Sequence, residues 1–138
     1  MTWSGSEILY EGFRLMLRKP NHINIWKLKD EFPQLVCIEH LLDKVNPDGL
    51  PEKEYNSSIA EFDHYMCSIF DESNQGIIFL VETYCGKRSY YYFTKPSFKI
   101  QSLVDIAKQK FEVNIECWEQ DDTNWGFLNA YPVKLYKE

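Results

Sequence analysis

The segment NIECWEQDD, residues 114–122, places a tryptophan among four carboxylates. An aromatic ring supplies apolar area that a partner can cover, while surrounding acids steer the approach of lysine and arginine side chains and pair with them. These residue types at this spacing therefore predict a surface that binds a basic protein. The candidate residues are Glu116, Trp118, Glu119, Asp121 and Asp122.

The structural alternative for the same segment is that the indoles are part of the core. Trp118 and Trp125 would then pack under the N-terminal segment or under the tail AYPVKLYKE, with the carboxylates pointing past them into water. Both interpretations hold together if Trp125 is buried and Trp118 is not.

The sequence contains none of the common motifs of enzyme active sites or metal sites. The sequence contains no G-x-S-x-G, no phosphate-binding glycine loop and no H-E-x-x-H, which are the short motifs of acyl transfer, nucleotide binding and zinc hydrolysis. The cysteines match neither a zinc ribbon nor a C-x-x-C pair, so we expect buried reduced thiols. We accordingly predict no enzyme, no catalytic residue, no metal and no cofactor. The cysteines are Cys37, Cys67, Cys85 and Cys117.

Tyr90 and Tyr92 add a second candidate surface, because they project to one side of the expected strand RSYYYFT. Paired rings on a four-stranded sheet are typical of RNA-recognition domains, in which bases stack on them. The adjoining acids Glu82 and Glu116 would repel phosphates. We therefore expect no direct contact with nucleic acid, and we keep an RNA-associated regulator as the alternative function.

These side chains must be positioned by two helices and several strands. Apolar residues recur at helical spacing in residues 51–73 and 97–111, with Ser97 as the expected N-cap of the second helix. Branched or aromatic runs predict strands at 34–40, 76–84 and 88–94, and alternation predicts a further strand at 112–119.

The order from residue 34 onward is β-α-β-β-α-β, which predicts an α+β, ferredoxin-like fold with an antiparallel sheet. Residues 11–18 alternate and the turn-like KPNH follows them, so we expect residues 7–29 to form an added N-terminal hairpin, a candidate cover for the open sheet face; the alternative is a helix capped by Ser6 and Glu7. The 138 residues fit a single domain. Its parts are a hairpin extension (1–31), the β-α-β-β-α-β unit (32–120) and a tail (121–138).

The charge is unevenly distributed. The formal net charge is −6, and residues 32–75 carry nine acidic side chains against two basic ones. Such a surface repels membranes and phosphate backbones and attracts basic partners. The start of the chain lacks a signal peptide pattern, and no apolar run is long enough to span a bilayer. We expect a cytoplasmic protein that does not contact membranes.

The motifs GLPEKEY, ETYCGKRSYYYF and DDTNWGFLNAYP resemble the bacterial domain of unknown function 695 family over residues 32–132. That resemblance implies no established activity. In topology and charge the chain is also similar to the ribonuclease E regulator B proteins. In size, acidity and expected location it is similar to the immunity proteins of bacterial toxin systems.

Together these observations predict an acidic binding protein. Its most concrete form is an immunity or inhibitor protein that neutralises a basic toxin nuclease by occupying the positive surface meant for its substrate. A small-molecule enzyme is a third, less favoured reading, because the sequence gives no reason to expect a deep polar pocket. A homodimer formed through the open sheet would hide the same surface.

Overall fold

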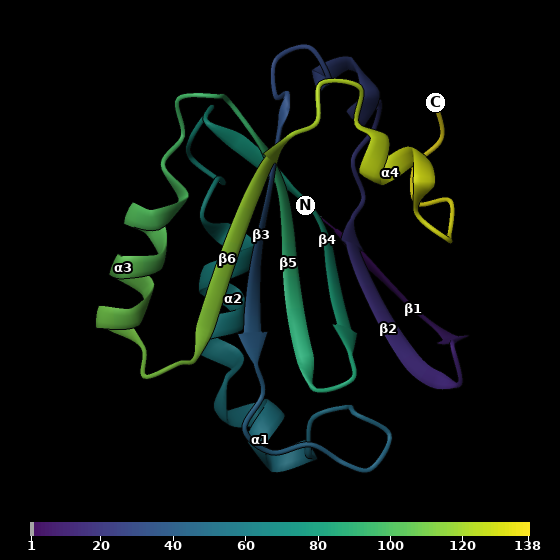
Figure 1. Ribbon diagram of the computed structural model, residues 1–138, viewed down its shortest axis with the longest axis vertical. Helices are drawn as coiled ribbons and strands as arrows, with labels where there is room; N and C mark the ends of the chain where they lie inside the picture. Colours follow the sequence, from purple (N-terminus) through teal and green to yellow (C-terminus); the bar gives the residue numbers. More distant parts are fainter. Residues whose placement is uncertain (1) are drawn as a thin grey trace.

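The computed structural model describes residues 2–138 and contains one six-stranded sheet (Figure 1). None of the helices within residues 2–138 combines the length and the apolar character that a membrane-spanning helix needs. The strands are β1 (Trp3–Tyr10), β2 (Phe13–Pro20), β3 (Gln34–Leu41), β4 (Gly76–Tyr84), β5 (Lys87–Thr94) and β6 (Ile115–Asp121). The helices are the 3-10 helix η1 (Ile25–Leu28), α1 (Lys53–Ser58), α2 (Ala60–Ser68), α3 (Ile100–Lys110) and α4 (Gly126–Ala130).

The strand order is β1-β2-β4-β5-β3-β6, and every neighbouring pair is antiparallel. The α+β class with an antiparallel sheet is thus confirmed. Two of the hairpins close with two-residue turns, at Glu11-Gly12 and Cys85-Gly86, in which both residues have positive φ. Such turns follow the right-handed twist of the strands, and glycine at the second position adopts positive φ without steric cost.

The N-terminal hairpin exists, but its predicted turn and role were wrong. The chain reverses at residues 11–12 rather than at KPNH, and residues 25–28 form η1 instead of a second strand. The hairpin does not lie over a sheet face. Leu15–Arg18 of β2 pair with Val81–Tyr84 of β4, so the hairpin adds two strands to the edge of the sheet.

Helices α2 and α3 cover one face of the sheet (Figure 1). Phe62 and Met66 of α2 and Val104 of α3 are buried there against Ile38 and Tyr92. The predicted helix over 51–73 is interrupted at Ile59, whose φ of −100° and ψ of 12° lie outside the helical region, so it forms α1 and α2. The second helix begins at Ile100 after Lys99, and Ser97 is not its N-cap.

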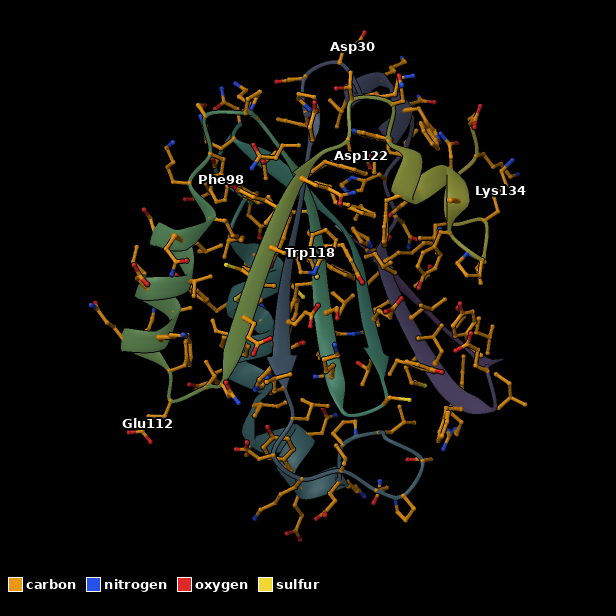
Figure 2. All side chains as sticks on the ribbon, in the orientation of Figure 1. Asp30, Phe98, Glu112, Trp118, Asp122 and Lys134 are labelled. Carbon is orange, nitrogen blue, oxygen red and sulfur yellow. The ribbon has the colours of Figure 1, made fainter. Side chains whose placement is uncertain are left out.

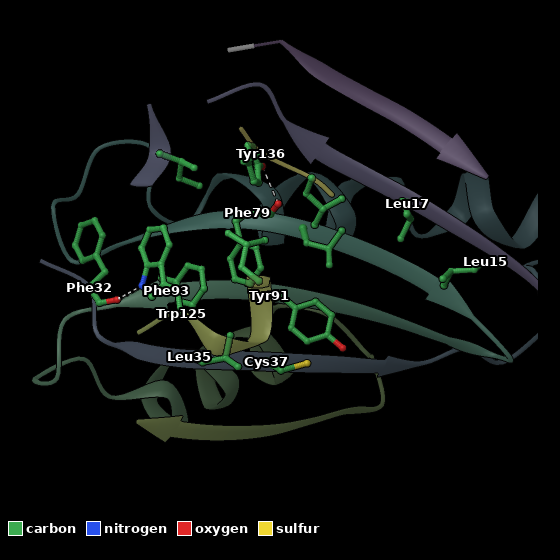
Figure 3. Packing of buried hydrophobic residues seen from close by; sticks show 14 residues of the cluster. Leu15, Leu17, Phe32, Leu35, Cys37, Phe79, Tyr91, Phe93, Trp125 and Tyr136 are labelled. Carbon is green, nitrogen blue, oxygen red and sulfur yellow. Dashed lines mark hydrogen bonds between the residues drawn. The ribbon is translucent and has the colours of Figure 1, made fainter. Parts of the chain in front are cut away.

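The other face is covered at one end by η1, α4 and the C-terminal tail (Figure 1). Trp125 is fully buried there, as the structural interpretation predicted; its ring stacks on Phe93 at 4.1 Å, and its Nε1 donates to the carbonyl oxygen of Phe32 at 2.8 Å (Figure 3). The hydroxyl of Tyr136 lies 2.8 Å from the carbonyl oxygens of both Pro20 and Phe79. The tail is therefore part of the core.

Candidate functional site

The end of the sheet face that α4 leaves uncovered carries a row of carboxylates. Glu116 of β6 is in register with Glu39 of β3, Glu39 with Ser89 of β5, and Ser89 with Glu82 of β4. Neighbouring strands lie about 4.8 Å apart, so the row crosses four strands within about 15 Å. We call this surface the acidic sheet face. Its residues are Glu39, Glu82, Lys87, Tyr91, Glu116 and Trp118.

Trp118 is half-buried on this face, and Figure 2 labels it beside β6 over the middle of the sheet. Its Nε1 donates to Glu39 Oε1 at 3.0 Å, and Lys87 Nζ lies 3.0 Å from Glu39 Oε2. Burial opposes the charge of Glu39, but the hydrogen bonds from Lys87 and Trp118 outweigh it and lower the pKa of this carboxyl. Glu39 is therefore a fixed anion that orients the indole.

Glu82 has a different environment at the other end of the row. It lines a cavity of about 290 Å³ together with Tyr10, Tyr84 and Tyr131, and it accepts a short hydrogen bond from the Tyr131 hydroxyl. Burial raises the pKa of Glu82 and the charge of Glu39 adds to this, although the Tyr131 hydrogen bond opposes the shift. A cation that entered the cavity would relieve the cost of this charge.

Replacing Glu82 with glutamine should raise the thermal midpoint at pH 7 by about 2–4 °C, the effect of roughly 1 kcal/mol in a domain of this size. The folded-state pKa of Glu82 is raised, so its contribution to stability is complete below the ordinary value of 4.5 and is lost as pH rises through the folded value. Circular dichroism melts at pH 7 and pH 3.5 measure the difference.

The stabilisation by Glu82→Gln should disappear at pH 3.5, where both side chains are neutral. Glu116→Gln, which changes an exposed carboxylate of the same row, is the control and should shift neither melt appreciably. A gain for Glu82→Gln that persisted at pH 3.5 would show that packing, and not ionisation, is responsible.

The structure divides the predicted carboxylate cluster. Glu116 and Trp118 lie on the acidic sheet face, but Glu119 lies on the opposite face, where it accepts a hydrogen bond from Gln34 Nε2 at 2.8 Å. Asp121 accepts from the Thr123 hydroxyl at 2.9 Å. Grouping these residues into one surface was wrong, because alternate residues of a strand face opposite ways.

Asp122 has a structural role at the start of α4, beside which Figure 2 labels it. Its Oδ1 accepts the backbone N–H of Gly126 at 2.8 Å, and its Oδ2 accepts that of Phe127 at 3.2 Å. These amides have no partner within the helix, so the carboxylate satisfies them. The side chain thus has a structural role at the start of α4, and its predicted role in binding a partner stays a prediction.

Tyr90 and Tyr92 do project to the same side, as predicted, but that side is the one under α2. Both rings are fully buried. The Tyr90 hydroxyl donates to Asp63 Oδ1 at 2.7 Å, and the Tyr92 hydroxyl donates to the carbonyl oxygen of Met66 at 2.6 Å. The prediction that they lie on an open face was wrong, and bases cannot stack on them in this fold.

Sequence reasoning missed Glu39 as a member of the site and Tyr131 as the hydrogen-bond partner of Glu82. Glu39 interrupts the apolar run QLVCIEH, just as Glu82 interrupts GIIFLVETY. A lone carboxylate inside an otherwise apolar strand is a usable signal, because burying it is costly unless it is paired. Tyr131 follows α4, and nothing local in the sequence indicates that its hydroxyl reaches β4.

The cysteines and histidines do not form a reactive group at this site. Cys37 lies beneath the acidic sheet face, where burial and the charges of Glu39 and Glu82 raise the pKa of its thiol and keep it protonated. All four cysteines are free, but Cys85 is exposed in its turn, so the expectation of burial was wrong there. Across residues 2–138, no three His, Cys, Asp or Glu side chains are grouped to hold a metal ion.

Comparison with known proteins identifies the family. A family of unknown function (DUF695) matches residues 21–131, which includes β3 to α4 and every residue of the acidic sheet face. The match begins earlier than the resemblance over 32–132 predicted, and it excludes the hairpin β1–β2. Comparison with curated proteins and with solved structures gave no match. The chain therefore belongs to the family of unknown function DUF695.

Proposed function

We propose that the protein acts by binding rather than by catalysis, and that the acidic sheet face receives a basic segment of a protein partner. The observation that carries this proposal is the in-register row of Glu116, Glu39 and Glu82 in the uncovered part of the sheet. Lys87 offsets one of the three charges. The row keeps an excess of negative charge beside a half-exposed indole.

The surroundings of the row favour lysine or arginine as the group bound. Tyr91 is buried and packs edge-on against Trp118, with ring centroids 6.3 Å apart, so it supports the indole, which is the half-exposed ring beside the carboxylates. Guanidinium and ammonium groups bind such rings through cation–π contacts and bind carboxylates through charge-assisted hydrogen bonds. The 290 Å³ cavity beside Glu82 is at the small end of ligand pockets, which suits one side chain of the partner.

The narrower form of the proposal is an immunity or inhibitor protein that blocks a toxin nuclease in the cytoplasm. Its support is the acidity of the chain, with a net charge of −6, and the in-register row of carboxylates on the acidic sheet face. Co-expression with a basic nuclease encoded beside this gene tests it. Cells should survive with the wild-type chain and should die with a Glu39→Lys, Glu116→Lys variant that still folds.

The proposed fold is the ferredoxin-like arrangement for β3 to β6 with α2 and α3. The order β4-β5-β3-β6 and the antiparallel pairing support it, because the β-α-β-β-α-β chain path produces this order when both helices cover one face. The RNA-associated alternative is not carried forward, since it depended on Tyr90 and Tyr92.

The binding site itself is tested by nuclear magnetic resonance titration with a short peptide in which lysine and arginine alternate with alanine. Amide shifts should concentrate on β3, β5 and β6 around the acidic sheet face. Glu116→Lys should weaken binding about tenfold, which corresponds to about 1.4 kcal/mol.

The matched control is Glu119→Lys, the same charge change on the opposite side of the same strand. It should leave the affinity within about twofold, because only long-range attraction is altered. Equal weakening by the two variants would mean that the peptide responds to net charge alone, and the proposed site would be wrong.

A further inference from the structure

A second cavity, of about 380 Å³, opens on the face of the sheet that carries α2. Its polar lining comes from Arg18 of β2, Asn56 of α1, Asp63 of α2, and Thr83 and Arg88 at the β4–β5 end. The cavity thus lies on the side away from the acidic sheet face, and its chemistry is opposite in sign.

Two guanidinium groups share one carboxylate in this cavity. Arg18 binds Asp63 through two hydrogen bonds of 2.6 and 2.9 Å, and Arg88 Nη1 lies 3.5 Å from Asp63 Oδ1. The Arg88 side chain is only 9% exposed. Among the described residues that line the cavity, Asp63 supplies the single carboxylate. One positive charge is left without a counter-ion in a partly buried site, although the whole chain is acidic.

The hydrogen bonds lead to the same conclusion as the charges. Asp63 also accepts from the Tyr90 hydroxyl, so its Oδ1 accepts three hydrogen bonds and its Oδ2 accepts one, from Arg18. Each guanidinium has five N–H donors. Within the described chain, Arg18 uses two of them, and Arg88 uses three, on Asp63, Thr83 and Asn56. Five guanidinium donors therefore remain, while Asp63 has room for only one further hydrogen bond, at Oδ2.

The rest of the lining is apolar and indicates what the anion is attached to. Met16, Leu50 and Pro51 border the cavity beside the arginines. A ligand with one negative charge would balance the site, while a doubly charged phosphate would exceed the balance. A short apolar stem on that ligand would cover the wall formed by Met16, Leu50 and Pro51.

From these observations we infer that the cavity between β2, α1 and α2 binds a small organic monocarboxylate, with Arg18 and Arg88 pairing with its oxygens. The inference is independent of the acidic sheet face. Arg18 lies outside the range that matches the family, residues 21–131, whereas Asp63 and Arg88 lie inside it. The hairpin of this chain therefore completes the site.

The test is a titration of the full chain with sodium butyrate, followed through backbone amide resonances at constant ionic strength. Saturable shifts should centre on Asn56, Ala60 and Thr83. Sodium chloride and butylammonium chloride should not reproduce them, and phosphate should bind more weakly than butyrate.

A variant that fills the cavity keeps the arginines in place. Ala60 lines the cavity and is exposed at the start of α2, so Ala60→Leu should retain the fold and abolish the saturable shifts. Ser57→Leu is the matched control, because Ser57 is exposed on α1 and is not part of the lining. Arg18→Gln should weaken butyrate binding about tenfold, the effect of losing one charge-assisted hydrogen bond.

Shifts that do not saturate, or that are scattered over surface lysines, would overturn the inference. Equal binding by Ala60→Leu and Ser57→Leu would also overturn it, because the anion would then lie elsewhere. Tighter binding of phosphate than of butyrate would overturn the assignment of the ligand as a monocarboxylate.

Discussion

Replacing Trp125 with alanine is expected to lower the free energy of unfolding by about 3–5 kcal/mol, the range for deleting a large buried aromatic side chain. The indole is fully buried, stacks on Phe93 with an interplanar angle of 3° and satisfies the carbonyl oxygen of Phe32 (Figure 3). Alanine would leave a cavity and an unpaired buried acceptor at once. Urea unfolding followed by circular dichroism measures the change.

The control for this experiment is Trp3→Ala. Trp3 is 36% exposed on the edge strand β1, so its removal should change the free energy of unfolding by no more than about 0.5 kcal/mol. A loss below about 1 kcal/mol for Trp125→Ala would mean that α4 and the tail do not pack on the sheet as described.

Asp63→Ala is the second substitution for which a large loss is expected, about 3–5 kcal/mol, because it removes the counter-ion of two partly buried arginines. Arg18 and the Tyr90 hydroxyl would lose their acceptor, and Arg88 would lose its ion-pair partner while keeping its hydrogen bonds to Thr83 and Asn56. Arg18 also ties the hairpin to α2, so the hairpin amides should exchange faster in the variant. The control is Glu61→Ala, because Glu61 is an exposed acid in the first turn of the same helix.

The effect of Asp63 should depend on pH. Burial opposes its charge, but the hydrogen bonds and charges of Arg18 and the bond from Tyr90 outweigh this and lower its pKa below the ordinary value of 3.8. A lowered folded-state pKa contributes stability that is present above the ordinary value and is lost as pH falls through the folded value. The difference between wild type and Asp63→Ala should therefore be complete at pH 6 and shrink below pH 3. A difference that stays constant to pH 2 would contradict the ion-pair explanation.

The sequence predicts the central strands well because their local signals are strong. The run GIIFLVETY predicts β4 over the residues it occupies, 76–84, since branched and aromatic residues have few alternatives to a sheet. The N-terminal hairpin was predicted with the wrong turn because KPNH has stronger turn chemistry than Glu11-Gly12. The position of the turn is decided by the pairing of β2 with β4, which joins residues far apart in the chain.

The candidate site depends on long-range register, and for that reason only part of it could be predicted. Alternation along β6 places Trp118 on one face of the strand and Ile115 and Cys117 on the other, and this can be predicted from the strand's own sequence. The partners of Trp118 are not local: Glu39 comes from β3 and Lys87 from β5. The burial of Tyr90 under α2 and of Tyr91 under Phe127 of α4 likewise depends on contacts that no strand pattern reveals.

The attachment of Tyr136 to Pro20 and Phe79 has a consequence for biosynthesis. A ribosome delivers β2 and β4 long before residue 136, and the layer formed with α2 and α3 can close once β6 has emerged. The apolar side around Phe79 and Phe93 then stays open to water until Tyr136 has left the exit tunnel. During that interval one face of the sheet is covered by helices and the other exposes apolar side chains, and chaperones shield intermediates of this kind from aggregation.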